Sequence, residues 1–108
     1  MRKQFLIAVG LVISSAASAQ EWKAAIEKWR SCADAAAARF SKSSESALAV
    51  ARLAALSCSA EKKQATQAIS QTDGAAFADE YIETAERHYI DRLSVKVIEM
   101  RLSGTEKR

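Results

Sequence analysis

The sequence predicts an all-α protein. Proline is absent and only 3 glycines occur among the 108 residues, which disfavours turn-rich β-sandwiches and barrels. Alanine, the residue with the best helix propensity, is abundant. Apolar side chains recur every three or four residues in three segments, which is typical of helices with one buried face. The predicted fold is an antiparallel helical hairpin stapled by one disulfide, with a long third helix that completes a three-helix bundle.

Residues 1–19 have the layout of a secretory signal peptide. A short basic start precedes an apolar run over residues 5–13, and small residues follow up to Ala19. The alternative is a membrane anchor, but the apolar run is shorter than the ~20 residues that a spanning helix needs. We therefore expect cleavage after Ala19 and a periplasmic or secreted location. The mature chain is predicted to be one helical domain over residues 20–104 with a polar tail over 105–108.

The net charge of the mature chain excludes one class of function. The full chain has 16 basic and 13 acidic residues and a net charge of +3. Two of the basic residues belong to the signal peptide, so the mature chain has 14 basic and 13 acidic residues and a net charge of +1. Charges of both signs alternate along the segments, without the basic face that releases counterions from phosphates. We expect no nucleic-acid partner and no stable membrane anchor after cleavage.

Cys32 and Cys58 are the only cysteines. An even number of cysteines in a short exported chain indicates a disulfide. The alternatives are a metal pair and two free thiols. Two cysteines and a single distant histidine do not supply four zinc ligands, and a Cys-x-x-Cys redox pair is absent. We therefore predict a structural bridge, and closing a loop of about 27 residues corresponds to roughly 3.5 kcal/mol.

The first helical segment extends from about Glu21 to Phe40. Its apolar stripe consists of Trp22, Ile26, Trp29, Ala33, Ala36 and Phe40. The serine-rich residues 41–44 then interrupt the pattern, because serine hydroxyls compete for backbone groups and favour caps and turns. We expect Ser44 to cap the next helix, with Glu45 in its first turn.

The second segment extends from about Glu45 to Ser70. Residues 47–56 are apolar nearly all round, which predicts a helix that is covered on more than one side. The cysteines at positions 32 and 58 lie about equally far from the serine-rich turn. This is the expected arrangement for residues that face each other across an antiparallel helical hairpin.

The third segment extends from about Gly74 or Ala75 to Ser103, with Gly104 as a helix stop. One face consists of Ala78, Ile82, Ala85, Tyr89, Leu93, Val97 and Met100, and beside it lie Phe77, Tyr81, His88, Val95 and Leu102. Residues 93–97 also alternate as a strand would, but a lone strand has no partner in this chain, so a helix is preferred.

The third helix is expected to be longer than the hairpin and to overhang it. The predicted interaction surface on this overhang consists of Leu93, Val95, Val97, Ile98, Met100 and Leu102. So much apolar surface is unusual for a free helix end. We expect either the second helix or a second chain to cover it.

The hairpin combines Trp29-x-x-Cys32, Ala36-x-x-Arg39-Phe40, Ser44-Glu45-x-Ala47, Val50-Ala51, Ala54-Ala55 and Cys58. This stretch resembles a group of small exported α-helical proteins of unknown function that have a two-cysteine helical hairpin. It departs from their pattern at Ser46, where many of them have proline. The resemblance covers the hairpin only, and it implies no catalytic residue.

The residues that bear chemistry do not form a recognisable catalytic pattern. His88 is the one histidine, and Asp91 lies one helical turn away, but a lone histidine at a helix edge is usually a surface or partly packed residue. The carboxylates of Asp79, Glu80, Glu83 and Glu86 line one helix instead of facing each other across a cleft. Metal-ligand and nucleophile motifs are absent. We expect no enzymatic activity, no cofactor and no bound metal.

The leading functional hypothesis is a non-catalytic protein–protein interaction module of the cell envelope, which binds a protein partner or itself. One alternative is a periplasmic stress or holdase-type chaperone, whose apolar faces become exposed on acidification. A more remote alternative is a small enzyme that uses His88 with Asp91.

Overall fold

The computed structural model describes residues 22–106, which are helical apart from short connections. The N-terminal helix spans residues 22–40, and it is followed by α2 (Ala47–Ser57), α3 (Ser59–Asp73) and α4 (Ala75–Glu106). No strand occurs in this part of the chain, so the all-α class is confirmed. The predicted signal peptide over residues 1–19 and the last two residues of the predicted polar tail lie outside the described residues.

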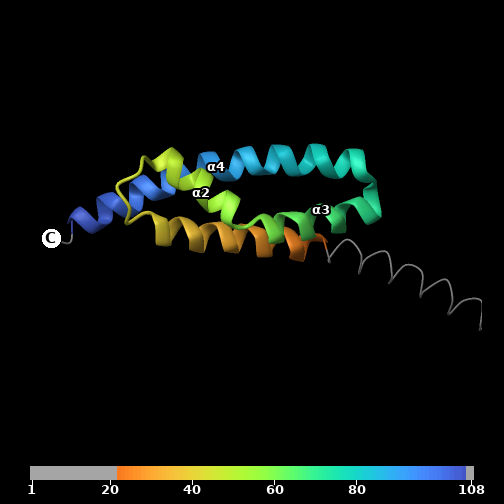
Figure 1. Cartoon of the computed structure of the whole chain (residues 1–108), viewed down its shortest axis with the longest axis horizontal. Coiled ribbons are helices and arrows are strands. Elements are labelled where there is room, and N and C mark those ends of the chain that lie inside the picture. The colour runs from red at the N-terminus through yellow and green to blue at the C-terminus, as the bar shows by residue number, and fades with distance from the viewer. Residues whose placement is uncertain (1–21, 107–108) are drawn as a thin grey trace, which may run out of the picture.

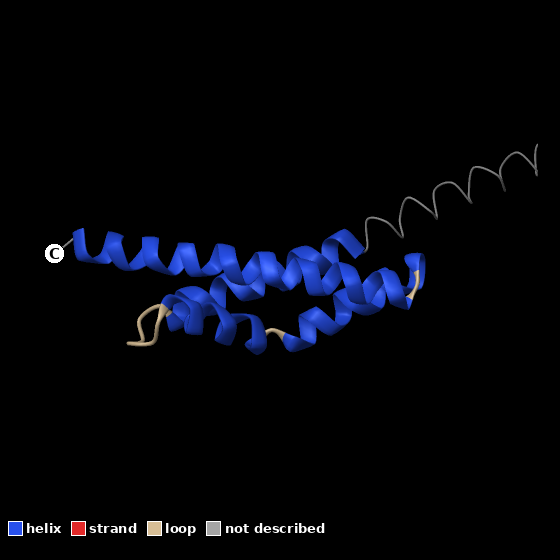
Figure 2. Cartoon of the chain, turned by 90° about the horizontal axis from the view of Figure 1, so that it is seen from above, coloured by secondary structure: helices blue, strands red, loops and turns tan. Residues whose placement is uncertain are grey.

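The helices form an elongated bundle in which α4 runs along the whole length (Figure 1). The N-terminal helix and α4 run in the same direction, and α2 and α3 lead back in the opposite direction, one after the other (Figure 1). Both α2 and α3 contact α4. The end of α4 projects past the loop that joins the N-terminal helix to α2 (Figure 2).

Two helices occupy the place of the single second helix that the sequence predicts. The chain breaks at Cys58, where φ is −106° and ψ is 31°, and the Cys58 N–H donates to the carbonyl of Ala55 at 3.3 Å, three residues back. Neither glycine nor proline lies at this break. Because Cys58 is bonded to Cys32 on the N-terminal helix, we attribute the break to tertiary constraints. Residues 22–106 therefore form four helices, and the three-helix detail of the predicted fold is not confirmed.

The helix ends follow local capping chemistry. The side chain of Ser46, and not that of Ser44, accepts a hydrogen bond from the Ala49 N–H at 3.1 Å and caps α2. Gly74 separates α3 from α4 with a φ of 91°, which is accessible to glycine at no steric cost. Gly104 does not adopt such a φ, so α4 continues past the expected stop to Glu106.

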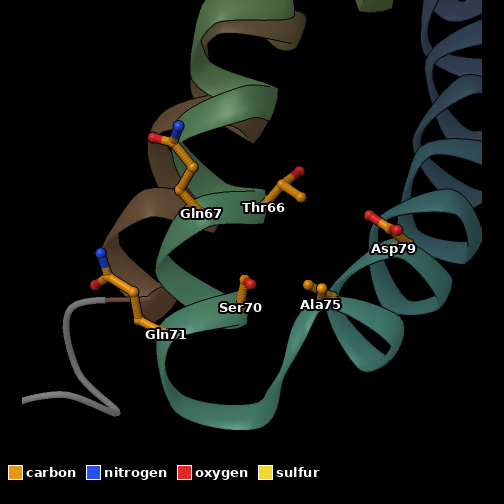
Figure 3. A pocket seen from close by; sticks show the side chains of 7 residues that line it. Thr66, Gln67, Ser70, Gln71, Ala75 and Asp79 are labelled. Atoms are coloured by element: carbon orange, nitrogen blue, oxygen red, sulfur yellow. The ribbon is translucent and has the colours of Figure 1, made fainter.

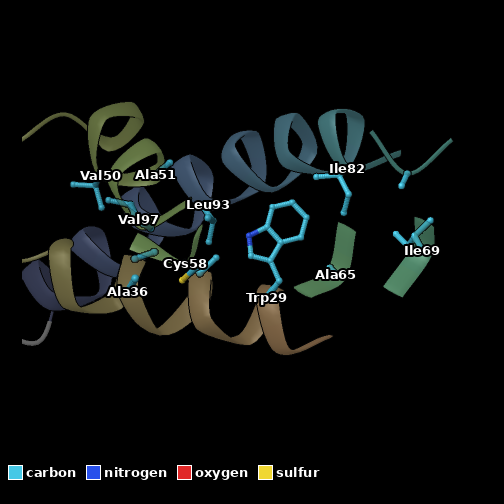
Figure 4. Packing of buried hydrophobic residues seen from close by; sticks show 14 residues of the cluster. Trp29, Ala36, Val50, Ala51, Cys58, Ala65, Ile69, Ile82, Leu93 and Val97 are labelled. Atoms are coloured by element: carbon cyan, nitrogen blue, oxygen red, sulfur yellow. The ribbon is translucent and has the colours of Figure 1, made fainter. Parts of the chain in front are cut away.

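The core lies between the helices and is built from apolar side chains of all of them (Figure 4). Trp29 is fully buried near its centre, and its ring meets the ring of Tyr89 edge-on at a centroid distance of 4.8 Å. Many of the other buried positions are alanines, which allow the helix backbones to approach closely. Among the described residues no polar or charged residue is fully buried.

Arg101 fastens α4 to the connection between the N-terminal helix and α2. Its Nε donates to the carbonyl of Ser41 at 2.9 Å, and Nη2 donates to the carbonyls of Ser43 at 3.0 Å and Glu45 at 2.7 Å. Carbonyls at the end of a helix lack intrahelical partners, and the helix dipole favours a cation there. One side chain therefore fixes where the hairpin turn lies along α4.

Candidate interaction surface

The predicted bridge between Cys32 and Cys58 is confirmed. The two Cα atoms lie 6.0 Å apart and the sulfurs are bonded. Cys58 is fully buried and Cys32 is half-buried, and the described residues contain no free cysteine. The bridge joins the middle of the N-terminal helix to the junction of α2 and α3, so it acts as a structural staple.

The six residues of the predicted interaction surface lie on two different faces of α4. Leu93 and Val97 are buried in the core and Met100 is half-buried against it. The side chains that remain accessible to a partner are Val95, Ile98 and Leu102, with exposed fractions of 57%, 50% and 59%. The helices of the chain itself therefore cover one half of the predicted surface and leave the other half open.

The three exposed side chains belong to a longer row along α4, which we call the outer stripe. It consists of Phe77, Tyr81, Thr84, His88, Asp91, Val95, Ile98 and Leu102, all of which are exposed. Their spacings alternate between four and three residues, which is the seven-residue repeat of helices that pair in coiled coils. The apolar members lie towards the two ends of the stripe, and the polar members lie at its centre.

The sequence predicts part of the outer stripe, because it places five of its members beside the main apolar face of the third helix, namely Phe77, Tyr81, His88, Val95 and Leu102. Thr84, Asp91 and Ile98 join this row only in the structure. The signal is the alternating spacing, but the face of α4 that packs against α2 and α3 carries apolar residues at similar spacing. Only the burial pattern separates the two faces. At one end of the stripe, Tyr81 is flanked by Trp22, whose ring meets it edge-on at 5.4 Å, and by Phe77 at 6.0 Å.

Two surface grooves beside α4 are candidate ligand sites. The first, with a volume of about 510 Å³, lies between α3 and α4 near their turn, and Thr66, Ser70 and Asp79 line it (Figure 3). The Thr66 hydroxyl already donates to the carbonyl of Lys62 at 2.8 Å. The second groove, of about 290 Å³, lies between the N-terminal helix and α4 beside the Lys96–Asp34 ion pair. In the first groove, Asp79 lies on α4 across the groove from the hydroxyls of Thr66 and Ser70 on α3 (Figure 3).

The candidate acid–base residues are dispersed. His88 and Asp91 are exposed members of the outer stripe. Of the four acidic residues on the first half of α4, three are exposed, and the fourth, Glu86, pairs with Lys62 at 2.9 Å. Within residues 22–106, no group of three or more His, Cys, Asp or Glu side chains is arranged to hold a metal ion. Burial raises the pKa of Tyr89 above its ordinary value of 10.0.

The comparisons with known proteins identify no relative. No family model matches the sequence, and no significant match was found among curated proteins or among solved structures.

In the part of the chain that the structure describes, none of the helices has the length and apolar character needed to cross a membrane. Function is therefore inferred from the surface and from the chemistry of the described residues.

Proposed function

We propose that this protein is a non-catalytic protein–protein interaction module, exported to the periplasm or secreted, and that the outer stripe of α4 is its working surface. The observation that carries the proposal is that α4 has two apolar faces. One face is buried against the other helices, and the outer stripe exposes large apolar side chains towards both of its ends, namely Phe77 and Tyr81 at one end and Val95, Ile98 and Leu102 at the other. Exposed apolar patches mark interaction sites in soluble proteins.

The disulfide and the dispersed acid–base residues support the same proposal. A structural disulfide in a short chain fits an oxidising compartment, which agrees with removal of residues 1–19 as a signal peptide. His88 and Asp91 project from an exposed helix face, where no wall excludes water from a substrate. An enzyme that depends on His88 is therefore the least favoured function.

The outer stripe is tested by changing one of its exposed apolar side chains. Ile98→Lys places a charge on the stripe, and Gln67→Lys adds the same charge to an exposed position on α3 as a matched control. We expect light scattering to detect assembly of the purified oxidised chain, or a photoreactive residue at position 102 to cross-link one defined partner protein. Ile98→Lys should abolish either interaction and Gln67→Lys should not.

The proposal is contradicted by two results obtained together. The first is a single-chain mass up to about 1 mM protein, a concentration at which even weak association is populated. The second is a photo-cross-linking pattern at position 102 that does not differ from the pattern at position 67.

A holdase-type chaperone is the second candidate, favoured by apolar residues outside the outer stripe. On α2, Leu48, Leu53 and Leu56 have exposed fractions of 43%, 47% and 71%. Such a chaperone would suppress the aggregation of an unfolded client in acid, and Leu56→Lys would weaken the suppression. Aggregation at the same rate with and without the protein would exclude this candidate.

A further inference from the structure

The side chains of the outer stripe are complementary to those of a second copy of the stripe that runs in the opposite direction. When two copies of α4 run antiparallel and overlap along the whole stripe, every member meets a residue that lies equally far from the midpoint of the stripe. In each pair named here, the second residue belongs to the second copy. The pairs are Phe77–Leu102, Tyr81–Ile98, Thr84–Val95 and His88–Asp91. Apolar side chains face apolar side chains at both ends, and an imidazole faces a carboxylate at the centre.

From this register we propose that the partner of the outer stripe is a second copy of this chain. The two α4 helices pair antiparallel about a twofold axis that crosses α4 between Tyr89 and Ile90. This inference rests on the proposed function and names its partner. A twofold axis makes the interface isologous, so each copy contributes the same surface and the assembly closes as a dimer.

A parallel pairing of the same stripe is much less favourable. Each residue would then lie opposite its own copy, so Asp91 would face Asp91 and His88 would face His88. In the antiparallel register the carboxylate of Asp91 accepts a hydrogen bond from the imidazole of His88 of the second copy. The twofold axis generates this pair twice, and the polar centre of the stripe thereby selects both the orientation and the register.

One charged pair beside the stripe fits the same orientation. In the antiparallel register, Glu80 of one copy lies towards Arg101 of the other. The second half of α4 carries Asp91 and Glu99 as well as Arg92, Lys96 and Arg101. The pairing of His88 with Asp91 therefore selects the orientation, and not a difference in charge between the two halves of α4.

The fold leaves the stripe available for this pairing. The α4 residues that pack inside the chain, including Ala78, Ile82, Leu93 and Val97, are nearly or fully buried, whereas all members of the stripe are exposed. In Figure 1, α4 lies along one edge of the bundle over most of its length, with α3 on its other side. Two chains can therefore associate as rigid bodies, without opening their cores.

Cysteine cross-linking tests both the orientation and the register. Thr84→Cys and Val95→Cys are prepared as separate chains, in which the native bridge leaves no other free thiol among the described residues. After mixing and mild oxidation we expect a disulfide-linked heterodimer of the two variants, whereas each variant alone stays uncross-linked. A covalent dimer of Thr84→Cys with itself would show parallel pairing and would overturn the proposal, as would the absence of the mixed cross-link.

A charge exchange tests the central pair. His88→Glu places like charges at two positions of each dimer, so we expect the dissociation constant of the dimer to rise about tenfold. Adding Asp91→Lys restores opposite charges and should restore most of the affinity. If the chain assembles and Ile98→Lys abolishes the assembly, but Thr84→Cys and Val95→Cys give no mixed cross-link, this register is refuted. The proposed function is not affected by that result. A single-chain mass at every concentration, with no partner captured at position 102, contradicts both.

Discussion

Replacing Arg101 by methionine tests how α4 is fastened to the hairpin turn. Methionine keeps an unbranched apolar stem but donates no hydrogen bond. The bond to the Ser41 carbonyl is partly buried, and a bond of this kind from a charged donor contributes about 1.5 kcal/mol. The bonds to Ser43 and Glu45 are exposed, and solvent reduces each to about 0.5 kcal/mol. We expect the free energy of unfolding to fall by about 2.5 kcal/mol, which lowers Tm by about 10–20 °C in a domain of this size.

Urea denaturation followed by circular dichroism measures this loss, with all variants at one protein concentration because the proposed self-association would also stabilise the fold. Arg92→Met is the matched control. The Arg92 guanidinium lies over the Tyr89 ring at 5.5 Å, and this contact at an exposed site contributes less than about 1 kcal/mol. Arg101→Lys should fall between the two, since it keeps the charge but not the planar fork. If Arg101→Met is as stable as Arg92→Met, the three carbonyl contacts do not hold the turn.

Three further predictions concern the bridge, the cap of α2 and the half-buried phenol of Tyr89. Removing the bridge with Cys32→Ala and Cys58→Ala should lower the free energy of unfolding by about 3.5 kcal/mol, which is the value for a closed loop of about 27 residues. A loss below about 1 kcal/mol in urea denaturation would contradict the role of the bridge as a staple. Ser46→Ala should cost about 1 kcal/mol, while Ser44→Ala should leave the urea midpoint unchanged; the reverse order would place the cap wrongly. Because burial raises the pKa of Tyr89 in the folded chain, stability is intact below the ordinary value of 10.0 and is lost as the pH rises through the raised value. Tyr89→Phe should therefore make the alkaline fall of Tm shallower, and an unchanged fall would show that another group causes it.

The elements that depend on local pattern were predictable from the sequence. The serine-rich turn places the end of the N-terminal helix at Phe40, where the structure has it, and the apolar stripe from Trp22 onwards predicts the helix itself. The third segment was also predicted as helix, because a lone strand over residues 93–97 lacks a partner. The even cysteine count predicted the bridge, since disulfides are common in short chains with the sequence features of export.

The features that depend on tertiary contacts were not predictable. The break at Cys58 has no glycine or proline signal, because it arises where the bridge and the packing of α2 and α3 on α4 meet. The contacts of Arg101 join residues 56–60 positions apart, and no periodic pattern encodes them. The sequence also shows two apolar rows on α4 without indicating that Leu93 is buried and Val95 is exposed.

The antiparallel pairing of α4 is tested most directly by the distance between two copies of one spin label. Ser103 is exposed near the end of α4 and lies outside the outer stripe, so Ser103→Cys can carry a nitroxide while the native cysteines remain bridged. At a rise of ~1.5 Å per residue, the antiparallel register predicts a distance of about 40 Å between the two labels at position 103. Position 87 lies close to the twofold axis, so for labels at that position the same register predicts a distance of roughly 10–15 Å. A short distance at position 103, or no intermolecular distance at either position in concentrated solution, would contradict the pairing.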